Sequence, residues 1–407
     1  MTKTVFFNIP AQGHINPSLP VIAELVRRGE EVIYVNTEES RALVESTGAT
    51  FRQTPPQPEL VALVQNSAGN IPRNALRLVQ IGEKILPFVL DLVRTEQPDY
   101  LIFDSLASWG KQAADALDIP AVASISTLLI APGAMPPFTP AMLLATLAQF
   151  LPVIPEYMRT ARRIRQNIGV KNVGLMGAVM SMGDLNIIYT SRDFQPSANR
   201  FDERYQFVGP SISPRPHDAG FPFDQITRQP MIYISLGTIN NDKLDFYRQC
   251  FAAFADHPGQ FILSAGKRTD LKALGEIPAN FIVRDFVPQL EILERTDVFI
   301  THGGMNSVSE GLWYGVPLVA IPQQVEQAVV ARAVREHGAG LALGTQPPFG
   351  VVTAGELRAA VDRILADRDS YKQAAIRLGD SFRAAGGYTR AADAILAFAR
   401  AHPRVKA

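Results

Sequence analysis

The sequence predicts an α/β protein made of two doubly wound, parallel-sheet domains, and three observations carry this prediction. Short apolar runs alternate with helical patterns along most of the chain, which is typical of parallel sheets covered by helices. A stretch rich in Pro, Gly and polar residues, 209–230, interrupts this alternation near the middle. The chain of 407 residues also exceeds the length at which a single hydrophobic core stops growing.

In the first half, strand-like runs and helical patterns follow each other in order. The predicted strands are 5–9, 31–36, 99–104 and 121–126. The first helix is predicted to begin at Pro17 with Asn16 as its cap and to end at Gly29, because proline favours the first helical position. Further helices are predicted over 75–95 and 109–117. Each strand is therefore followed by a helix that can return the chain to the same edge of the sheet.

The second half repeats this organisation. The predicted strands are 231–237, 260–266, 280–286, 298–302 and 317–322, and the chain reads as helical from Thr353 onward. We therefore predict an N-terminal domain over 1–212, a linker over 213–229 and a C-terminal domain over 230–385. The helical tail, 386–407, is expected to pack back on the N-terminal domain.

Composition excludes several functional classes. The chain is 47% hydrophobic and 19% charged, as in ordinary soluble globular proteins, and its 39 basic residues balance 39 acidic ones. This balance predicts no nucleic-acid partner and no polybasic membrane patch. The single cysteine, Cys250, excludes an intrachain disulfide, and no signal-peptide pattern precedes the first strand, so we expect a cytoplasmic protein.

The most apolar segment, 128–152, is interrupted by four prolines and so does not match a membrane-spanning helix. It closes a core or forms the wall of a pocket for an apolar ligand. Within it, Met135, Phe138 and Met142 are candidate acceptor contacts, as is Phe7 on the first strand. For each of these four side chains a plain core position is the competing interpretation.

A turn in the C-terminal half carries the clearest signal for a binding site. His302, Gly303 and Gly304 join the apolar strand to a helix that starts with Met-Asn-Ser. A helix N-terminus preceded by glycines suits a phosphate, although a simple capped turn would look the same. The turn matches neither a Walker A loop nor the G-x-G-x-x-G fingerprint, which excludes a nicotinamide dehydrogenase in practice.

The longer motif around this turn resembles a known family. From Phe286 the chain reads FVPQLEILERTDVFITHGGMNSVSEGLWYGVPLVAIPQQVEQ. This is similar to the nucleotide-sugar signature of the family 1 glycosyltransferases, with the spacing of the bacterial macrolide-type enzymes. The resemblance implies the GT-B fold, in which two Rossmann-like domains face each other across a cleft. It also implies an inverting transfer from a UDP-sugar, with UDP-glucose favoured and dTDP-sugars left open, and no metal or cofactor.

The resemblance also implies roles for individual residues. Phe286 would stack on the base, Val287 and Gln289 would meet the base and ribose, and Glu310 would accept from the ribose hydroxyls. The residues expected at the diphosphate are Ser235, Thr238, His302, Gly304, Asn306 and Ser307. Glu326 and Gln327 match the acidic-Gln pair that holds the sugar hydroxyls. Val330 stands where many members have asparagine, which leaves the identity of the sugar open.

The catalytic groups are expected at the carboxyl edge of the N-terminal sheet. His14 lies in PAQGHINP, after the first strand, where a lone histidine is usually a structural turn residue. The family carries its base in a G-H-x-x-P loop at this place, so the resemblance implies that His14 takes the acceptor proton. Asp104, which starts a D-x-x-x-x-W pattern ending at Trp109, would orient the imidazole.

The sequence predicts a hexosyltransferase that acts on a small apolar acceptor, such as a flavonoid, phenol, macrolide or other natural product. The alternatives are a sterol or lipid glycosyltransferase at a membrane surface, an epimerase of the same architecture, and a binding module without chemistry. The presence of both His14 and Asp104 argues against the binding module. The D-x-D at Asp367 and Asp369 lies in a charged helical segment and is read as a solvated face, and we expect a monomer.

Overall fold

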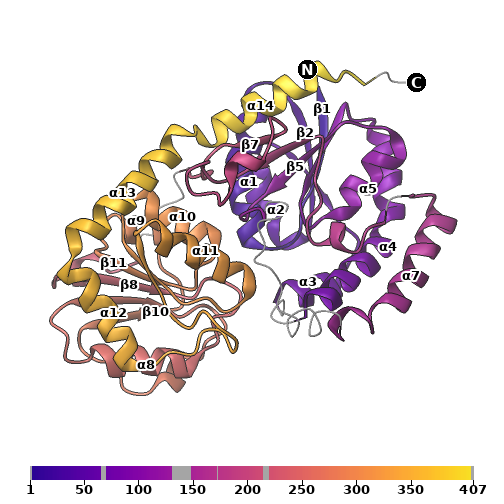
Figure 1. Cartoon of the computed structure of the whole chain (residues 1–407). Coiled ribbons are helices and arrows are strands. Elements are labelled where there is room, and N and C mark those ends of the chain that lie inside the picture. The colour runs from indigo at the N-terminus through magenta and orange to yellow at the C-terminus, as the bar shows by residue number, and fades with distance from the viewer. Residues whose placement is uncertain (1, 66–69, 131–147, 172, 214–219, 405–407) are drawn as a thin grey trace. The chain divides into compact units, whose positions relative to one another are not determined.

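The computed structural model describes residues 2–65, 70–130, 148–171, 173–213 and 220–404, which form two compact units (Figure 1). The first unit comprises Met1–Tyr189, Ser197–Ser211 and Ala385–Ala407, and the second comprises Thr190–Pro196 and Ile212–Ala384. Among the helices described, none combines the length and the apolar character that crossing a membrane requires.

The first unit is built on a seven-stranded, fully parallel sheet with the order β3-β2-β1-β4-β5-β6-β7. Its strands are β1 (Lys3–Phe7), β2 (Glu31–Asn36), β3 (Thr50–Gln53), β4 (Tyr100–Asp104), β5 (Ala121–Ile125), β6 (Leu185–Ile188) and β7 (Tyr205–Phe207). The four strands predicted in this half are confirmed. Strands β3, β6 and β7, which are only three or four residues long, were not predicted.

Helices cover both faces of this sheet (Figure 1). The helices of this unit are α1 (Gln12–Arg27), α2 (Arg41–Glu45), α3 (Pro58–Gln65), α4 (Ile71–Glu96), α5 (Ser108–Leu117), α7 (Ile154–Arg163) and α14 (Gly387–Ala401), of which α3 and α7 pack against α4. One core cluster lies under α4 and α5, and the other lies under α1 and α14. The C-terminal helix α14 buries Ile395 and Phe398 in that second cluster, and Arg28, the C-cap residue of α1, pairs with Asp393 at 2.5 Å.

The second unit contains a six-stranded parallel sheet with the order β10-β9-β8-β11-β12-β13. Its strands are β8 (Met231–Ser235), β9 (Gln260–Ser264), β10 (Phe281–Arg284), β11 (Val298–Thr301), β12 (Leu318–Ala320) and β13 (Gly340–Ala342). Its helices are α8 (Leu244–Phe254), α9 (Gln289–Leu293), α10 (Met305–Trp313), α11 (Val325–Glu336), α12 (Ala354–Ala366) and α13 (Arg368–Ala384). The five predicted strands are confirmed, and β13 was missed because its three residues start with a glycine.

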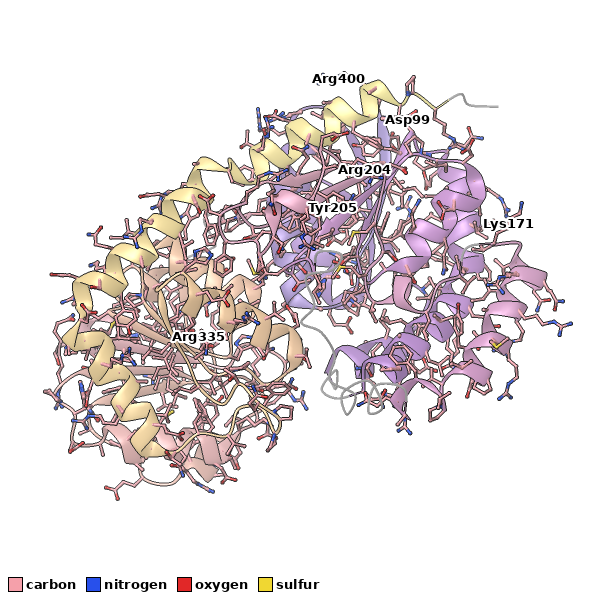
Figure 2. The ribbon with its side chains drawn as sticks, viewed as in Figure 1. Asp99, Lys171, Arg204, Tyr205, Arg335 and Arg400 are labelled. Carbon is pink, nitrogen blue, oxygen red and sulfur yellow. The ribbon has the colours of Figure 1, made fainter. Side chains whose placement is uncertain are left out.

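In each sheet, an aspartate just before a central strand forms two hydrogen bonds with the backbone of the first strand, an arrangement that we call a clamp. Asp99, labelled in Figure 2, lies just before β4. It accepts from the backbone N–H of Lys3 at 2.7 Å. Asp297, just before β11, accepts from the N–H of Met231 at 2.8 Å. Each aspartate also donates its own N–H to the carbonyl of the same partner residue. The carboxylate thus fixes the register at which the first strand meets its later neighbour.

These clamps act at the two places where the strand order reverses. In the first unit the chain builds β1, β2 and β3 to one side and then returns to place β4 beside β1. In the second unit it builds β8, β9 and β10 and returns to place β11 beside β8. Ligands in open α/β sheets bind beyond the carboxyl ends of the strands at such switch points. The segments after β1, β4, β8 and β11 are therefore where a site is expected.

The start of the first helix differs from the prediction. Helix α1 begins at Gln12, with Ala11 as its N-cap, and both Pro17 and Pro20 lie inside it. The Ala11 carbonyl accepts from the N–H groups of His14 and Ile15, each at 2.9 Å, so helical hydrogen bonding starts there. The prediction from Asn16 and Pro17 was wrong because this backbone pairing outweighs the preference of proline for the first turn. His14 consequently lies in a helical turn and not in a loop.

Candidate active site

His14 and Asp104 meet at the switch point of the first sheet. His14 lies in the first turn of α1, and Asp104 is the last residue of β4. The Nδ1 atom of His14 is 2.7 Å from Oδ2 of Asp104, and the exposed fractions of these side chains are 20% and 0%. The structure therefore brings together the two residues that the sequence analysis assigned to catalysis.

The Asp104 carboxylate is held on both oxygens. Its Oδ1 accepts from the N–H of Leu106 at 2.9 Å, while Oδ2 faces the imidazole. An ionised carboxylate can only accept, so the proton between the two side chains belongs to Nδ1 of His14. In the neutral ring this places the lone pair on Nε2. A histidine held in this way has the geometry that a general base oriented by a carboxylate requires.

A buried amide supports the backbone at His14. Asn8, which follows β1, donates from Nδ2 to the carbonyl of His14 at 3.2 Å and to the hydroxyl of Tyr34 at 2.7 Å. The Tyr34 hydroxyl also lies 2.9 Å from that of Ser18 in α1. Because these groups are buried, their hydrogen bonds fix how α1 leaves the sheet. The sequence analysis missed Asn8, although a polar residue directly after an apolar strand is a usable signal.

Ser126 is a second residue that the sequence analysis missed. It follows β5, the neighbour of β4, and its hydroxyl lies 3.1 Å from Nδ1 of His14. The residue is 8% exposed. Ser126 is the last residue of the strand predicted over 121–126, so a polar residue at the same edge as Asp104 was a usable signal.

The second unit places a tight glycine turn at its own switch point. His302, Gly303 and Gly304 connect β11 to α10, as predicted, and Gly303 has φ of +78°, a conformation that favours glycine. A Cβ on Gly304 would lie 2.3 Å from Nε2 of His302, and one on Gly237 would lie 2.5 Å from Cε1 of the same ring. The imidazole is thus packed between two stretches of backbone that leave no room for a side chain.

This packing keeps His302 uncharged. Burial lowers the pKa of His302 to about 4, and the backbone of Ser235 offsets this only in part. Its Nδ1 atom is buried and has no hydrogen-bond partner among the described residues. A neutral imidazole can still donate one N–H, so His302 can offer a hydrogen bond to an anion without carrying a charge.

The start of α10 suits an anionic group. Gly304 is the N-cap, no acidic residue lies in the first turn, and Asn306 and Ser307 are the second and third residues of the helix. Unpaired N–H groups and the positive end of the helix dipole favour a phosphate there. The buried Ser235 ends the adjacent strand β8, where its hydroxyl accepts from the N–H of Gly237 at 3.2 Å, while Thr238 is exposed.

A buried glutamate lies further along α10. Glu310 is 4% exposed, and the side-chain amide of Gln289 donates to its Oε2 at 2.5 Å. The hydroxyl of Tyr233 donates to Oε1 of Gln289 at 3.0 Å, and the Tyr233 ring stacks on Phe299 with centroids 4.6 Å apart. The structure therefore joins two residues predicted to hold the ribose, Gln289 and Glu310, and anchors them to the sheet.

Four further residues were predicted to contact the sugar donor, and they differ in how exposed they are. Phe286 follows β10 and is 58% exposed, as a ring that stacks on a ligand must be, whereas Val287 is buried. Gln327, in the first turn of α11, accepts from the N–H of Gln323 at 2.8 Å, and its carbonyl borders Gly303. Glu326 beside it is exposed.

Of the four residues predicted to contact the acceptor substrate, the structure describes only Phe7. Phe7 is 1% exposed and packs in the core beside Phe103, because β1 is a central strand covered on both faces. We therefore correct that prediction: Phe7 offers no surface to an acceptor. Met135, Phe138 and Met142 lie outside the described residues. No cluster of His, Cys, Asp and Glu in the described parts of the chain could hold a metal ion.

Comparisons with known proteins agree with this architecture. Residues 251–395 match the model of the erythromycin biosynthesis protein CIII-like C-terminal domain. The chain is 35% identical to YojK of Bacillus subtilis, named as an uncharacterized UDP-glucosyltransferase, over 97% of both proteins. It is 31% identical to the demethyllactenocin mycarosyltransferase of Streptomyces fradiae, over 97% of this chain and 86% of that one.

The structure also resembles a solved one. The crystal structure of the glycotransferase of kitacinnamycin superposes with a TM-score of 0.83 at 29% identity, over 98% of this chain and 99% of that one. Sequence and fold thus agree over nearly the whole length. This chain belongs to the family 1 glycosyltransferases, in the group of the bacterial macrolide-type enzymes, and it has their GT-B fold.

Proposed function

We propose that this glycosyltransferase transfers a hexose from a UDP-sugar, UDP-glucose in the first place, to a hydroxyl of a small apolar acceptor such as a macrolide, phenol or flavonoid. The observation that carries the proposal is the 2.7 Å contact between His14 and Asp104 at the switch point of the first unit. The relative named as a UDP-glucosyltransferase supports the choice of donor.

In this proposal His14 acts as the general base. Its Nε2 takes the proton of the acceptor hydroxyl while the acceptor oxygen bonds to the anomeric carbon of the sugar. The bond from that carbon to the diphosphate breaks, and UDP leaves with the electron pair. Asp104 stabilises the imidazolium that forms, because it accepts from Nδ1. A single in-line displacement inverts the anomeric centre, so an α-linked donor gives a β-glycoside.

The second unit would hold the donor without a metal. Negative charge that grows on the departing diphosphate meets the N–H groups at the start of α10 and the neutral His302. Asn306, Ser307, Ser235 and Thr238 would add side-chain donors, and Glu310 with Gln289 would bind the ribose. The base would stack on Phe286 beside Val287. Glu326 and Gln327 would bind the sugar hydroxyls.

The test is detection of product by mass spectrometry. The purified protein is mixed with UDP-glucose and a pool of flavonoids, phenols, sterols and macrolides, beside the variants His14→Ala and His402→Ala. His402 is an exposed histidine at the end of α14, so its loss controls for histidine removal as such. We expect a mass gain of one hexose in the wild type and the control, a loss of about 100-fold or more in His14→Ala, and a β-configured anomeric proton by NMR.

Three outcomes would overturn the proposal or one part of it. Undiminished transfer by His14→Ala would remove the assigned base. Transfer only from a dTDP-sugar or UDP-N-acetylglucosamine, run as parallel arms, would replace the assigned donor. A sterol as the favoured acceptor would point to the alternative of a sterol or lipid glycosyltransferase.

A further inference from the structure

The hydroxyl of Ser126 faces the same ring nitrogen that Asp104 holds. Its Oγ is 3.1 Å from Nδ1 of His14, compared with 2.7 Å for Oδ2 of Asp104. Among the described residues, this nitrogen is the hydrogen-bond partner found for the Ser126 hydroxyl. The residue is 8% exposed, so solvent does little to satisfy that hydroxyl. A buried polar group aimed at a reacting side chain calls for a functional explanation.

The chemistry of the imidazole defines what Ser126 can do. Nδ1 carries one hydrogen, and the shorter contact assigns it mainly to Asp104. The Ser126 oxygen then shares that hydrogen as a second acceptor in a three-centre bond. One acceptor alone leaves the ring free to swing about the hydrogen bond. Two acceptors, at the ends of the adjacent strands β4 and β5, fix the plane of the ring.

We propose that Ser126 is a positioning residue for the base, which holds the His14 imidazole in plane and stabilises its protonated form. This inference rests on the proposed function of His14. A hydrogen bond from Nδ1–H strengthens when the ring becomes positive, so the Ser126 oxygen stabilises imidazolium more than neutral imidazole. Its removal should therefore make His14 lose its proton at lower pH.

The other titratable groups nearby do not mask this effect. Among the described residues, Asp104 is a charged group in direct contact with the ring. Tyr34 on β2 and Tyr189 after β6 both feel the Asp104 charge, but burial raises the pKa of each phenol far above neutrality, so both stay protonated. The change in titration on removing Ser126 can thus be assigned to its own contact with His14.

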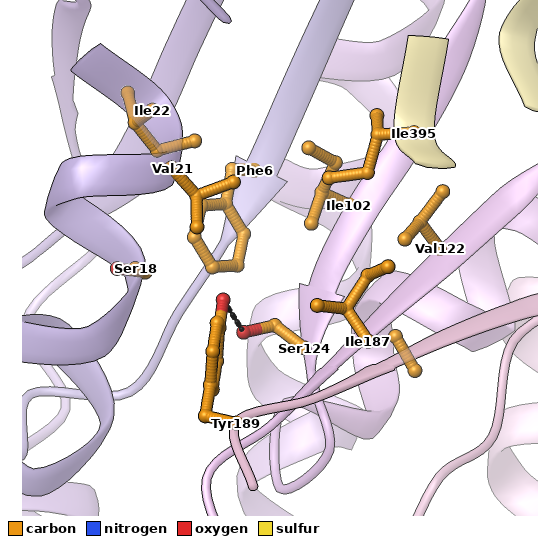
Figure 3. Close-up of a pocket in the computed structure, with 11 residues that line it drawn as sticks. Phe6, Ser18, Val21, Ile22, Ile102, Val122, Ser124, Ile187, Tyr189 and Ile395 are labelled. Carbon is orange, nitrogen blue, oxygen red and sulfur yellow. Dashed lines mark hydrogen bonds between the residues drawn. The ribbon is translucent and has the colours of Figure 1, made fainter. Parts of the chain in front are cut away.

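A matched control lies two residues earlier, on β5. Ser124 is 4% exposed, and its hydroxyl lies 3.0 Å from that of Tyr189, beside a small apolar-lined cavity of about 10 Å³ (Figure 3). Ser124→Ala removes a buried serine hydroxyl from β5 without touching His14. Ser126→Ala removes the one that contacts His14, and Ser126→Thr keeps a hydroxyl at that position.

The experiment measures kcat, KM for UDP-glucose and the pH profile of kcat/KM for these three variants, His14→Ala and the wild type. We expect Ser126→Ala to lower kcat about tenfold, with KM within about twofold, and to move the acid limb of the profile to lower pH. Ser126→Thr should stay within about threefold of the wild type, and Ser124→Ala should keep the wild-type profile. A wild-type kcat and pH profile in Ser126→Ala would overturn the proposal. So would a loss of activity in Ser126→Ala without any movement of the profile, which would mark a structural role.

A second readout does not depend on turnover. The 15N shifts of the His14 imidazole, assigned by their absence in His14→Ala, are followed against pH. Their midpoint should be lower in Ser126→Ala than in the wild type and unchanged in Ser124→Ala. Identical midpoints in all three proteins would overturn the role of Ser126. Transfer that survives in His14→Ala would instead overturn the proposed function, and the NMR titration would still report on the contact.

Discussion

The Nδ1 atom of His14 lies 2.7 Å from Oδ2 of Asp104, although the two residues are 90 positions apart in the sequence. The contact joins the first turn of α1 to the end of β4, across the place where the strand order of the first sheet reverses. The glycine turn at His302 occupies the corresponding place in the second sheet. Each unit thus carries its candidate chemistry at its own switch point.

Replacing Asp104 by Asn should abolish most of the activity while preserving the fold. The amide can still accept from the N–H of Leu106, but it can no longer stabilise an imidazolium, and its NH2 favours the wrong tautomer of His14. We expect kcat to fall about 100- to 10,000-fold. Steady-state kinetics measures the loss, and circular dichroism with UDP binding checks that the variant is folded. Asp104→Asn with a kcat near that of the wild type would rule out the assigned role.

Replacing Gly304 by Ala should damage the donor site through sterics alone. The φ of Gly304 is −63°, so the backbone itself accepts a side chain, but the new Cβ would lie 2.3 Å from the His302 ring. The ring has backbone on its other side at Gly237 and must move. We expect UDP affinity to fall at least about tenfold, and the free energy of unfolding to fall by about 1–3 kcal/mol.

Gly355 is the matched control for this substitution. It lies in α12, and a Cβ there would meet nothing within 4 Å. Gly355→Ala should leave UDP binding unchanged and hold or raise the free energy of unfolding, by up to about 1 kcal/mol. Calorimetric UDP titration and urea unfolding of both variants distinguish the two sites. If Gly304→Ala and Gly355→Ala had the same UDP affinity and the same free energy of unfolding, the His302 ring would tolerate the added methyl group.

The stability of the protein should depend on pH through His302. Its pKa is lowered from 6.5 to about 4 by burial, so the unfolded chain binds a proton in this window that the folded chain does not. The neutral ring makes its full contribution to the free energy of unfolding above about pH 6.5, and this contribution is lost as the pH falls toward 4. The free energy of unfolding should drop over this range by up to about 3 kcal/mol from this group. Burial also lowers the pKa of His257, which adds in the same direction.

Urea unfolding at pH 7 and at pH 5 measures the slope of the free energy of unfolding against pH. The variant His302→Gln should show a clearly smaller slope than the wild type, whereas the exposed-site variant His402→Ala should keep it. A wild-type slope in His302→Gln would mean that the buried imidazole is not the group responsible.

Glu310→Gln should weaken UDP binding because it removes the proposed contact with the ribose hydroxyls. The buried carboxylate receives the Gln289 amide, and its loss removes a charged acceptor for the ribose hydroxyls. We expect UDP affinity to fall about 10- to 100-fold. The wild type should discriminate UDP from its 2′,3′-dideoxy analogue, and the variant should bind both alike. Glu326→Gln is the control, since this exposed acid is assigned to the sugar and its loss should leave UDP affinity unchanged. Continued discrimination by Glu310→Gln would refute the assignment.

Much of the fold could be predicted because its strands are buried on both faces and read as apolar runs. The nine strands predicted from such runs are all present. Strands β3, β6, β7 and β13 are short and each contains a polar residue or a glycine, so they lack the uninterrupted apolar run that marks the other strands. The start of α1 was misjudged because the local preference of Pro17 was outweighed by backbone pairing at Ala11.

The sequence by itself determined the two α/β halves, the glycine turn at His302 and the candidate pair His14 and Asp104, because local composition and spacing encode strands, turns and motifs. Only the tertiary structure decided which groups share a contact. It placed Ser126 and Asn8 at His14, joined Gln289 to Glu310, and buried Phe7 in the core. These outcomes follow from the order of the strands in each sheet, which brings residues far apart in the sequence to one edge and which no local pattern records.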